Sequence, residues 1–230
     1  MAKILVIGDL HEPYSRKGYF QFCCDIHDKY GCNKVVFIGD VVDLHAISFH
    51  TKLPGMPGAS DEIERTKKTL KQWVKAFPKA NVCIGNHDAR PVRLAATVGI
   101  PESLLKDFPD IWGTPGWKWR WDFVIDDVFY IHGTDNGGEH PSYNKMKSLG
   151  LSCVMGHIHA AAGIKWLASP VKRMFGMDVG CGVDDKQMAF AYSKFARRRS
   201  IISCGVVIDG IPYHEVCPIG VGEKYSDERF

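Results

Sequence analysis

One recurring pattern constrains the fold of this chain: short apolar, β-branched runs that end at glycine followed by Asp or Asn. Each run is long enough for a buried strand and too short for a helix. The three runs and their ends are 4–7 with Gly8 and Asp9, 35–38 with Gly39 and Asp40, and 82–84 with Gly85 and Asn86. Helical stretches are predicted between them, at 18–30 and 61–77, the second beginning with a capping box at Ser60. Strand, helix, strand, helix, strand predicts parallel βαβ units and an α/β fold.

The rest of the chain also reads mainly as strands. Trp and polar residues alternate over 117–125, which predicts one strand that forms a hairpin with 128–131. The alternating Trp side chains fit either a buried sheet face or a base-stacking surface. Further strands are predicted at 153–155 and 174–179. We expect 201–207 and 212–216 to form a hairpin that completes a second sheet.

Length and composition indicate an ordinary globular protein. The 230 residues fit one domain, 1–230, and the formal charge of +3 is too small for binding polyanions by overall charge. The eight cysteines are scattered without a CxxC pair, which favours a reduced, cytoplasmic location. No apolar run approaches the ~20 residues that span a bilayer, so we expect no membrane association.

The predicted strand ends carry residue types that bind metal ions. The carboxyl ends of neighbouring strands meet at one sheet edge, so residues distant in sequence should converge there. Asp40 can bridge two cations, and imidazole and amide groups complete mixed shells that suit Mn, Fe, Zn or Ni better than Ca or Mg. Each short motif is common by chance, but their ordered set is specific. Its members are Asp9, His11, Asp40, Asp43, Asn86, His87, His132, His157 and His159.

This set resembles the motifs of the calcineurin-like metallophosphoesterase family. The matching segments are Asp9-Leu10-His11, Gly39-Asp40-Val41-Val42-Asp43, Gly85-Asn86-His87-Asp88, His132-Gly133 and Gly156-His157-Ile158-His159, so the resemblance extends from residue 9 to residue 159. It implies an α/β fold with four layers, α/β/β/α, built on two mixed β-sheets.

The resemblance also implies the ligands of two divalent metal ions, with Mn²⁺ as first choice and Fe, Zn or Ni as alternatives. One ion would bind Asp9, His11, Asp40 and His159. The other would bind Asp40, Asn86, His132 and His157, with Asp40 shared between them.

The same resemblance implies a mechanism. A hydroxide between the two ions would attack phosphorus directly, without a covalent enzyme intermediate. His87 is the expected general acid, oriented by Asp43. Asp88 is an alternative partner for His87, or it supports the loop.

The chain departs from the protein serine/threonine phosphatases of this family. They carry Arg-Gly after the second motif, where this chain has Leu44 and His45. This difference, with Asp88 in place of Glu, favours the branch of nucleotide phosphodiesterases, a DNA-repair nuclease and small phage or bacterial phosphoesterases. The loops 52–59 and 134–140 are candidates for substrate selection.

Substrate contacts are less constrained by the sequence. Arg90, beside the motif of the predicted acid, and His45 are the candidate contacts, while His50 and the basic residues 197–199 fit either contacts or a solvated surface. The resulting prediction is a phosphodiesterase acting on nucleotides or nucleic acid. Two alternatives stay open: a phosphomonoesterase acting on a small molecule or a phosphoprotein, and a non-catalytic binding module. The sequence leaves the oligomeric state open.

Overall fold

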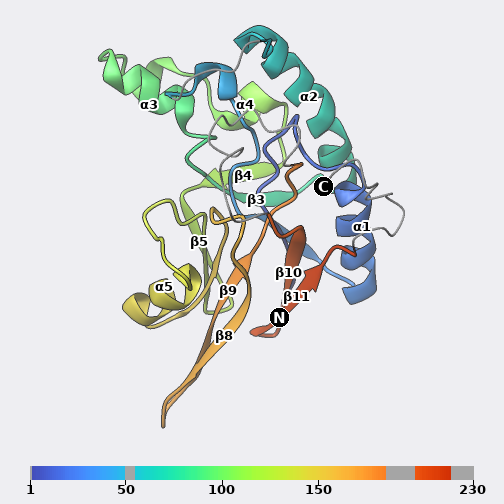
Figure 1. Cartoon of the computed structure of the whole chain (residues 1–230), viewed down its shortest axis with the longest axis vertical. Coiled ribbons are helices and arrows are strands. Elements are labelled where there is room, and N and C mark those ends of the chain that lie inside the picture. Colours follow the sequence, from blue (N-terminus) through green and yellow to red (C-terminus); the bar gives the residue numbers. More distant parts are fainter. Residues whose placement is uncertain (1, 50–54, 185–199, 219–230) are drawn as a thin grey trace.

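Two mixed β-sheets form the centre of the molecule in a computed structural model, which describes residues 2–49, 55–184 and 200–218 (Figure 1). The first sheet has the order β11-β10-β1-β2-β3-β4 and the second β5-β6-β7-β9-β8. The strands of the first sheet are β1 (Lys3–Ile7), β2 (Lys34–Phe37), β3 (Ala80–Cys83), β4 (Trp117–Arg120), β10 (Ser203–Ile208) and β11 (Ile211–Val216). Those of the second are β5 (Asp122–Ile125), β6 (Val128–Ile131), β7 (Ser152–Met155), β8 (Ala162–Ala168) and β9 (Arg173–Val179).

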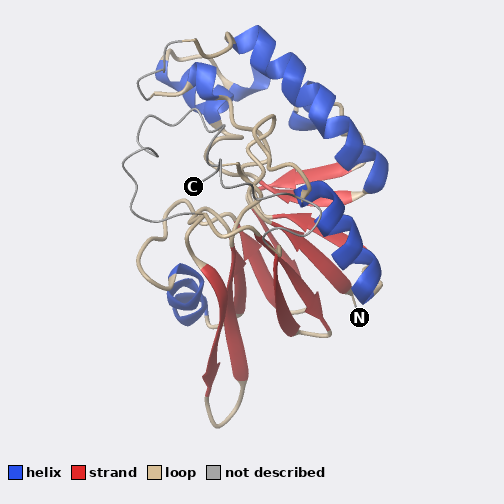
Figure 2. Ribbon diagram, turned by 45° about the vertical axis from the view of Figure 1, so that its right-hand side comes forward, coloured by secondary structure: helices blue, strands red, loops and turns tan. Residues whose placement is uncertain are grey.

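Helices cover the outer faces of the sheets (Figure 2). They are α1 (Tyr19–Tyr30), α2 (Ala59–Ala76), α3 (Arg90–Thr97), α4 (Phe108–Trp112) and α5 (Pro141–Leu149), with 3₁₀ turns η1 (His45–Ile47) and η2 (Glu102–Leu104).

The apolar core has three parts, and together they define the four predicted layers. In β1, alternate side chains point to opposite faces. Leu5 and Ile7 pack among side chains of α1 and α2, whereas Ile4 and Val6 pack against the second sheet. A third cluster, which includes Met146 of α5, covers the other face of the second sheet. The α/β/β/α arrangement of two mixed sheets is therefore confirmed.

The predicted parallel units are present, because β2 pairs in parallel with both β1 and β3. Helix α2 buries Leu70 and Trp73 against the first sheet. The predicted capping box is wrong: α2 begins at Ala59 after Gly58, without a side-chain cap. Glu62 instead accepts the backbone N–H groups of His45 and Ala46, which lie in the loop after β2.

Two expectations about sheet membership are wrong. The residues 117–125 form two strands instead of one, because the chain leaves the first sheet after Arg120 and enters the second at Asp122. The side chain of Trp121, between them, is exposed. The predicted hairpin β10–β11 exists, but it extends the first sheet because β10 pairs with β1 in antiparallel register.

All eight cysteines are free thiols. Among the described residues, no helix combines the length and apolarity needed to cross a bilayer. The boundaries of the single predicted domain stay a prediction.

Candidate metal centre

The candidate ligands converge where the strands of both sheets end. Asp9 follows β1 and His132 follows β6, so each sheet contributes to the same edge. A hydrogen bond links the two sheets at this edge: the backbone N–H of His157, after β7, donates to Asp9 Oδ2 at 2.9 Å. The second sheet supplies the imidazoles of His132, His157 and His159, so both sheets are needed to assemble the candidate ligands.

The first group consists of Asp9, His11 and His159. Nε2 of His11 and Nε2 of His159 lie 3.2 Å apart, and His159 Nε2 lies 3.3 Å from Asp9 Oδ2. Asp9 and His11 are buried, whereas the His159 side chain is 20% exposed. All three can direct one ligand atom to a common point.

The second group consists of Asp40, His132, His157 and Asn86. His132 Nε2 lies 3.2 Å from Asp40 Oδ2 and 3.1 Å from Asn86 Oδ1. The other nitrogen of His132, Nδ1, donates to the carbonyl of Ile38, which leaves Nε2 as the ligand atom. The donor atoms of Asp40, His132 and His157 can also meet at one point.

Asp40 lies between the two groups. Its Oδ2 is 3.6 Å from His11 Nε2, and its Oδ1 accepts the backbone N–H of His87 at 2.8 Å. His11, Asp40 and His87 form a third cluster of possible ligand atoms. Asp40 is thus shared by two neighbouring clusters of possible ligand atoms, and its role as a bridge between two ions stays a prediction.

Asp43 orients two imidazoles at once. Its Oδ1 accepts Nδ1–H of His11 at 2.8 Å and Nδ1–H of His87 at 3.0 Å, and the backbone carbonyl of Asp43 also accepts the Nδ1–H of His87, at 2.9 Å. The bond to His11 was not predicted from the sequence. A carboxylate that fixes the tautomer of a metal-binding imidazole is the usual second layer of a metal site. Asp43 therefore leaves Nε2 of His11 directed toward Asp40 and His159.

The backbone of the centre is strained. His11, Asp40 and His157 adopt positive φ values of 50°, 45° and 69°, which side chains with a Cβ rarely adopt. Such conformations persist where surrounding contacts impose them, commonly at functional sites. The motif glycines are required for space: a Cβ at Gly85 would overlap the carboxylate of Asp40, and one at Gly156 that of Asp9.

The protein's own charges shift the pKa of several groups. Burial lowers the pKa of His132, but the carboxylates of Asp40 and Asp9 outweigh burial and raise it to about 10. Burial likewise opposes ionisation of Asp40, yet the surrounding imidazoles hold its pKa well below the ordinary value. Anionic and imidazole groups are thus packed close enough to depend strongly on one another's charge.

These residues fit divalent cations. With metal–ligand distances of about 2.0–2.2 Å, neighbouring ligands of one ion lie about 3.0–3.5 Å apart, as the Nε2 and carboxylate atoms do here. Asp9 Oδ1 is buried without a hydrogen-bond partner, a costly state that a bound cation would relieve. The mixed N/O donor set is suitable for Mn, Fe or Zn.

The remaining predicted residues lie around this centre. Asp88 accepts backbone N–H groups of Val42 and Gly85, and these bonds support the loops to which the two residues belong. Burial, followed by the nearby charge of Asp40, raises the pKa of Asp88 to about 7. Arg90 is 4% exposed, donating to the Asp43 carbonyl and lying 3.1 Å from His87 Nε2. His45 is buried, with its backbone bound to Glu62.

The two candidate loops differ in what can be described. Thr134, in the loop after His132, donates to Asn86 Oδ1 at 3.4 Å, a contact that the sequence did not predict. His50, residues 52–54 and the basic residues 197–199 lie outside the described residues. The contact of Glu62 with the loop after the second motif was also not predicted. The available signal was an acidic residue in the first turn of the predicted helix.

A four-layer α/β/β/α protein with His/Asp clusters suited to metal ions is the class that this fold and centre define. The sequence profile described as calcineurin-like phosphoesterase matches residues 2–182, more than half of the chain. The chain belongs to the calcineurin-like phosphoesterase family.

Solved structures with a similar chain path include three from different organisms. YfcE, a phosphoesterase from E. coli, shares 15% identity over 91% of this chain and 90% of its own, with a TM-score of 0.47. Vacuolar protein sorting 29 from Cryptosporidium parvum shares 14% over 94% and 96%, with a TM-score of 0.46. Nuclease MPE from Pseudomonas putida shares 13% over 92% and 86%, with a TM-score of 0.36. No curated protein matched the chain. The family assignment therefore rests on the sequence profile.

Proposed function

We propose that the chain is a dinuclear metal-dependent phosphodiesterase acting on nucleotides or nucleic acid. The observation that carries the proposal is the sharing of Asp40 and His11 among three groups of possible ligand atoms. Asp9, His11, Asp40 and His159 would hold one ion. Asp40, Asn86, His132 and His157 would hold the other. Two such ions, when bound, supply a nucleophile at neutral pH and neutralise charge on the phosphate oxygens.

His87 is the proposed general acid for the leaving oxygen. Its Nδ1–H is fixed by Asp43, so Nε2 is the atom that would deliver the proton. Burial and Arg90 lower the pKa of His87, while Asp40 and Asp43 raise it, and the net effect is an increase. This increase favours the protonated ring, which is the form that a general acid requires.

Diester preference is supported by the charges beside the centre. A monoester dianion needs more positive charge than a diester, and the second motif continues with Leu44 and His45 instead of a permanent cation. Arg90 lies next to the centre, but its guanidinium is engaged with Asp43 and His87. These contacts favour an orienting role for Arg90, with direct substrate contact as the alternative.

The test compares two substrates on one preparation. Metal-free protein is loaded with Mn²⁺ and assayed with bis-(p-nitrophenyl) phosphate and p-nitrophenyl phosphate. Asp40→Ala and His87→Ala should abolish turnover, whereas His27→Ala, at a partly exposed position of helix α1, should not. Faster diester hydrolysis is expected. Faster monoester hydrolysis would replace the proposal with a phosphomonoesterase, and two bound metals without turnover of either substrate would favour a binding module.

A further inference from the structure

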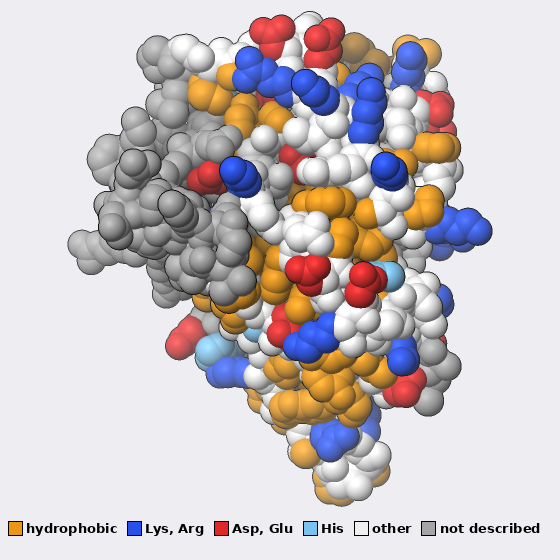
Figure 3. Space-filling model, turned by 90° about the vertical axis from the view of Figure 1, so that its right-hand side faces the viewer, with side chains coloured by type: hydrophobic (Ala, Val, Ile, Leu, Met, Phe, Trp, Pro, Cys, Tyr) orange, Lys and Arg blue, Asp and Glu red, His pale blue; other side chains and the backbone are white. Residues whose placement is uncertain are grey.

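Helix α2 carries a row of lysines on its solvent side. Lys67, Lys71 and Lys75 are spaced four residues apart, which places them along one flank at steps of about 6 Å. All three are exposed, and none forms an ion pair within the described part of the chain. Figure 3 shows Lys and Arg side chains gathered over the upper part of the face on which α2 lies.

The lysine row forms one wall of a groove of about 360 Å³ between α2 and α4. Val74, Ile111 and Trp112 give the groove apolar surface, and Asp110 is the acidic residue that lines it. Three ammonium groups therefore face one carboxylate. An extended anion with flat apolar parts would match both the positive charge of the lysines and the apolar surface of the groove.

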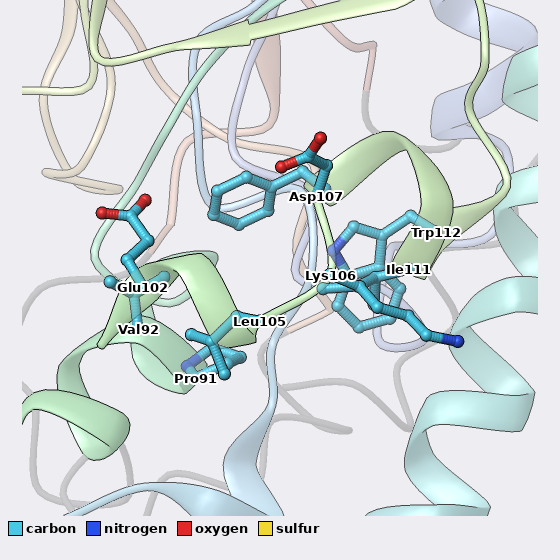
Figure 4. Close-up of a pocket in the computed structure, with 9 residues that line it drawn as sticks. Pro91, Val92, Glu102, Leu105, Lys106, Asp107, Ile111 and Trp112 are labelled. Atoms are coloured by element: carbon cyan, nitrogen blue, oxygen red, sulfur yellow. The ribbon is translucent and has the colours of Figure 1, made fainter. Parts of the chain in front are cut away.

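A second cavity, of about 240 Å³, adjoins this groove on the other side of α4. The two share Ile111 and Trp112. Figure 4 shows Pro91, Val92 and Leu105 around the second cavity, with Trp112 on the opposite side. Its lining is mainly apolar, as expected of a space for an unstacked base rather than for a phosphate.

The second cavity connects the lysine row with the candidate metal centre along the chain. Pro91 and Val92 line the cavity, and they directly follow Arg90, whose guanidinium contacts His87 in the centre. Centre, apolar cavity and lysine groove thus succeed one another across α3 and α4.

We propose that this succession is a track for single-stranded nucleic acid, in which Lys67, Lys71 and Lys75 bind phosphates and the apolar cavity accepts a base. The proposal rests on the proposed diesterase function for the chemistry at one end of the track. Phosphate contacts release counterions, so each lost contact lowers the salt dependence of binding by about 0.7 for single strands.

The experiment measures binding of a fluorescein-labelled phosphorothioate oligothymidylate, which resists cleavage, to the Mn²⁺-loaded full chain. Lys67→Gln/Lys71→Gln/Lys75→Gln should reduce the slope of log affinity against log salt by about 2, and affinity at 0.1 M salt by up to roughly 100-fold. The matched control, with the same change in charge, replaces the exposed Lys3, Lys34 and Lys147. Bis-(p-nitrophenyl) phosphate hydrolysis should stay unchanged in both triple variants.

Equal losses of affinity in the two triple variants would overturn the proposal, because general charge would then explain binding. Tighter binding of a duplex than of the single strand would also overturn it. If the wild type fails to hydrolyse the small diester while the α2 variant alone loses oligonucleotide affinity, the proposed function fails and the track survives.

Discussion

Asp43→Asn should show how much the candidate centre depends on the negative charge of Asp43, because the amide has nearly the same shape as the carboxylate. The carboxylate accepts N–H groups of His11 at 2.8 Å and His87 at 3.0 Å through one oxygen, and the amide carbonyl can occupy the same position. A hydrogen bond to a charged acceptor is worth about 1.5–3 kcal/mol, against about 0.5–1.5 for a neutral one. Losing about 1–1.5 kcal/mol at each bond gives a total of about 2–3 kcal/mol.

This loss corresponds to a decrease in kcat/KM of about 30- to 150-fold. It should be measured on bis-(p-nitrophenyl) phosphate with saturating Mn²⁺, together with metal content, because His11 is also a proposed ligand. The protein contains a control in the pair His27 and Asp28 on α1, whose Nδ1 and Oδ1 atoms lie 3.0 Å apart and whose carboxylate is exposed. Asp28→Asn should leave activity unchanged. A decrease below about threefold for Asp43→Asn, with full metal content, would refute the assignment of Asp43 as the orienting group.

Three further substitutions address other contacts. Arg90→Lys should lower kcat about 10- to 100-fold with little change in KM, because a lysine cannot reproduce the planar fork beside His87; steady-state kinetics will separate the two constants. Gly85→Ala should reduce bound metal, since the added Cβ overlaps the carboxylate of Asp40, and elemental analysis will measure the loss. Burial raises the pKa of Asp178, more than its hydrogen bonds lower it, so ionisation costs stability as pH rises through the folded pKa. The stability of Asp178→Asn relative to wild type, measured by urea unfolding, should therefore increase as the pH rises above about 4, the ordinary pKa of an aspartate.

Each of these has a control or a contrary result. A selective rise in KM for Arg90→Lys would indicate substrate contact instead. Gly137→Ala, at a position with open space around the added Cβ, should retain full metal content, and equal metal loss in both glycine variants would contradict the packing argument. A pH-independent difference for Asp178→Asn would show that this carboxyl group does not titrate differently on folding.

Local sequence pattern predicted most of the strands, although it missed β8, and it did not predict every sheet to which they belong. The alternation over 117–125 looks the same whether one strand or two produce it, and only pairing with β3 and β6 reveals the exchange between sheets. The hairpin β10–β11 was predicted from two neighbouring apolar segments, whereas its place beside β1 depends on a pairing of residues distant in the sequence, Lys3 with Ile208. Sheet order is a long-range property that short windows do not contain.

The order of motifs predicted which residues gather at the centre, because strand ends of the same edge must meet. It did not predict the positive φ of His11, Asp40 and His157, since these conformations are imposed by contacts and opposed by intrinsic preference. It also did not predict the second imidazole on Asp43. Two rings can share one carboxylate oxygen only if side chains that follow three strands, β1, β2 and β3, lie close together.

The loop after β2 explains why the roles of these residues are coupled. Asp40 belongs to two of the clusters suited to cations, and Asp43 accepts hydrogen bonds from His11 and His87. Glu62 of α2 accepts the backbone N–H groups of His45 and Ala46 in the same loop. A shift of this loop would therefore move a shared ligand and the proposed acid together. Burial of Glu62, at 1% exposure, and its two backbone bonds keep the loop against α2. One short segment thus carries a shared candidate ligand and orients the proposed acid, as the proposed attack and proton delivery on the same phosphate would require.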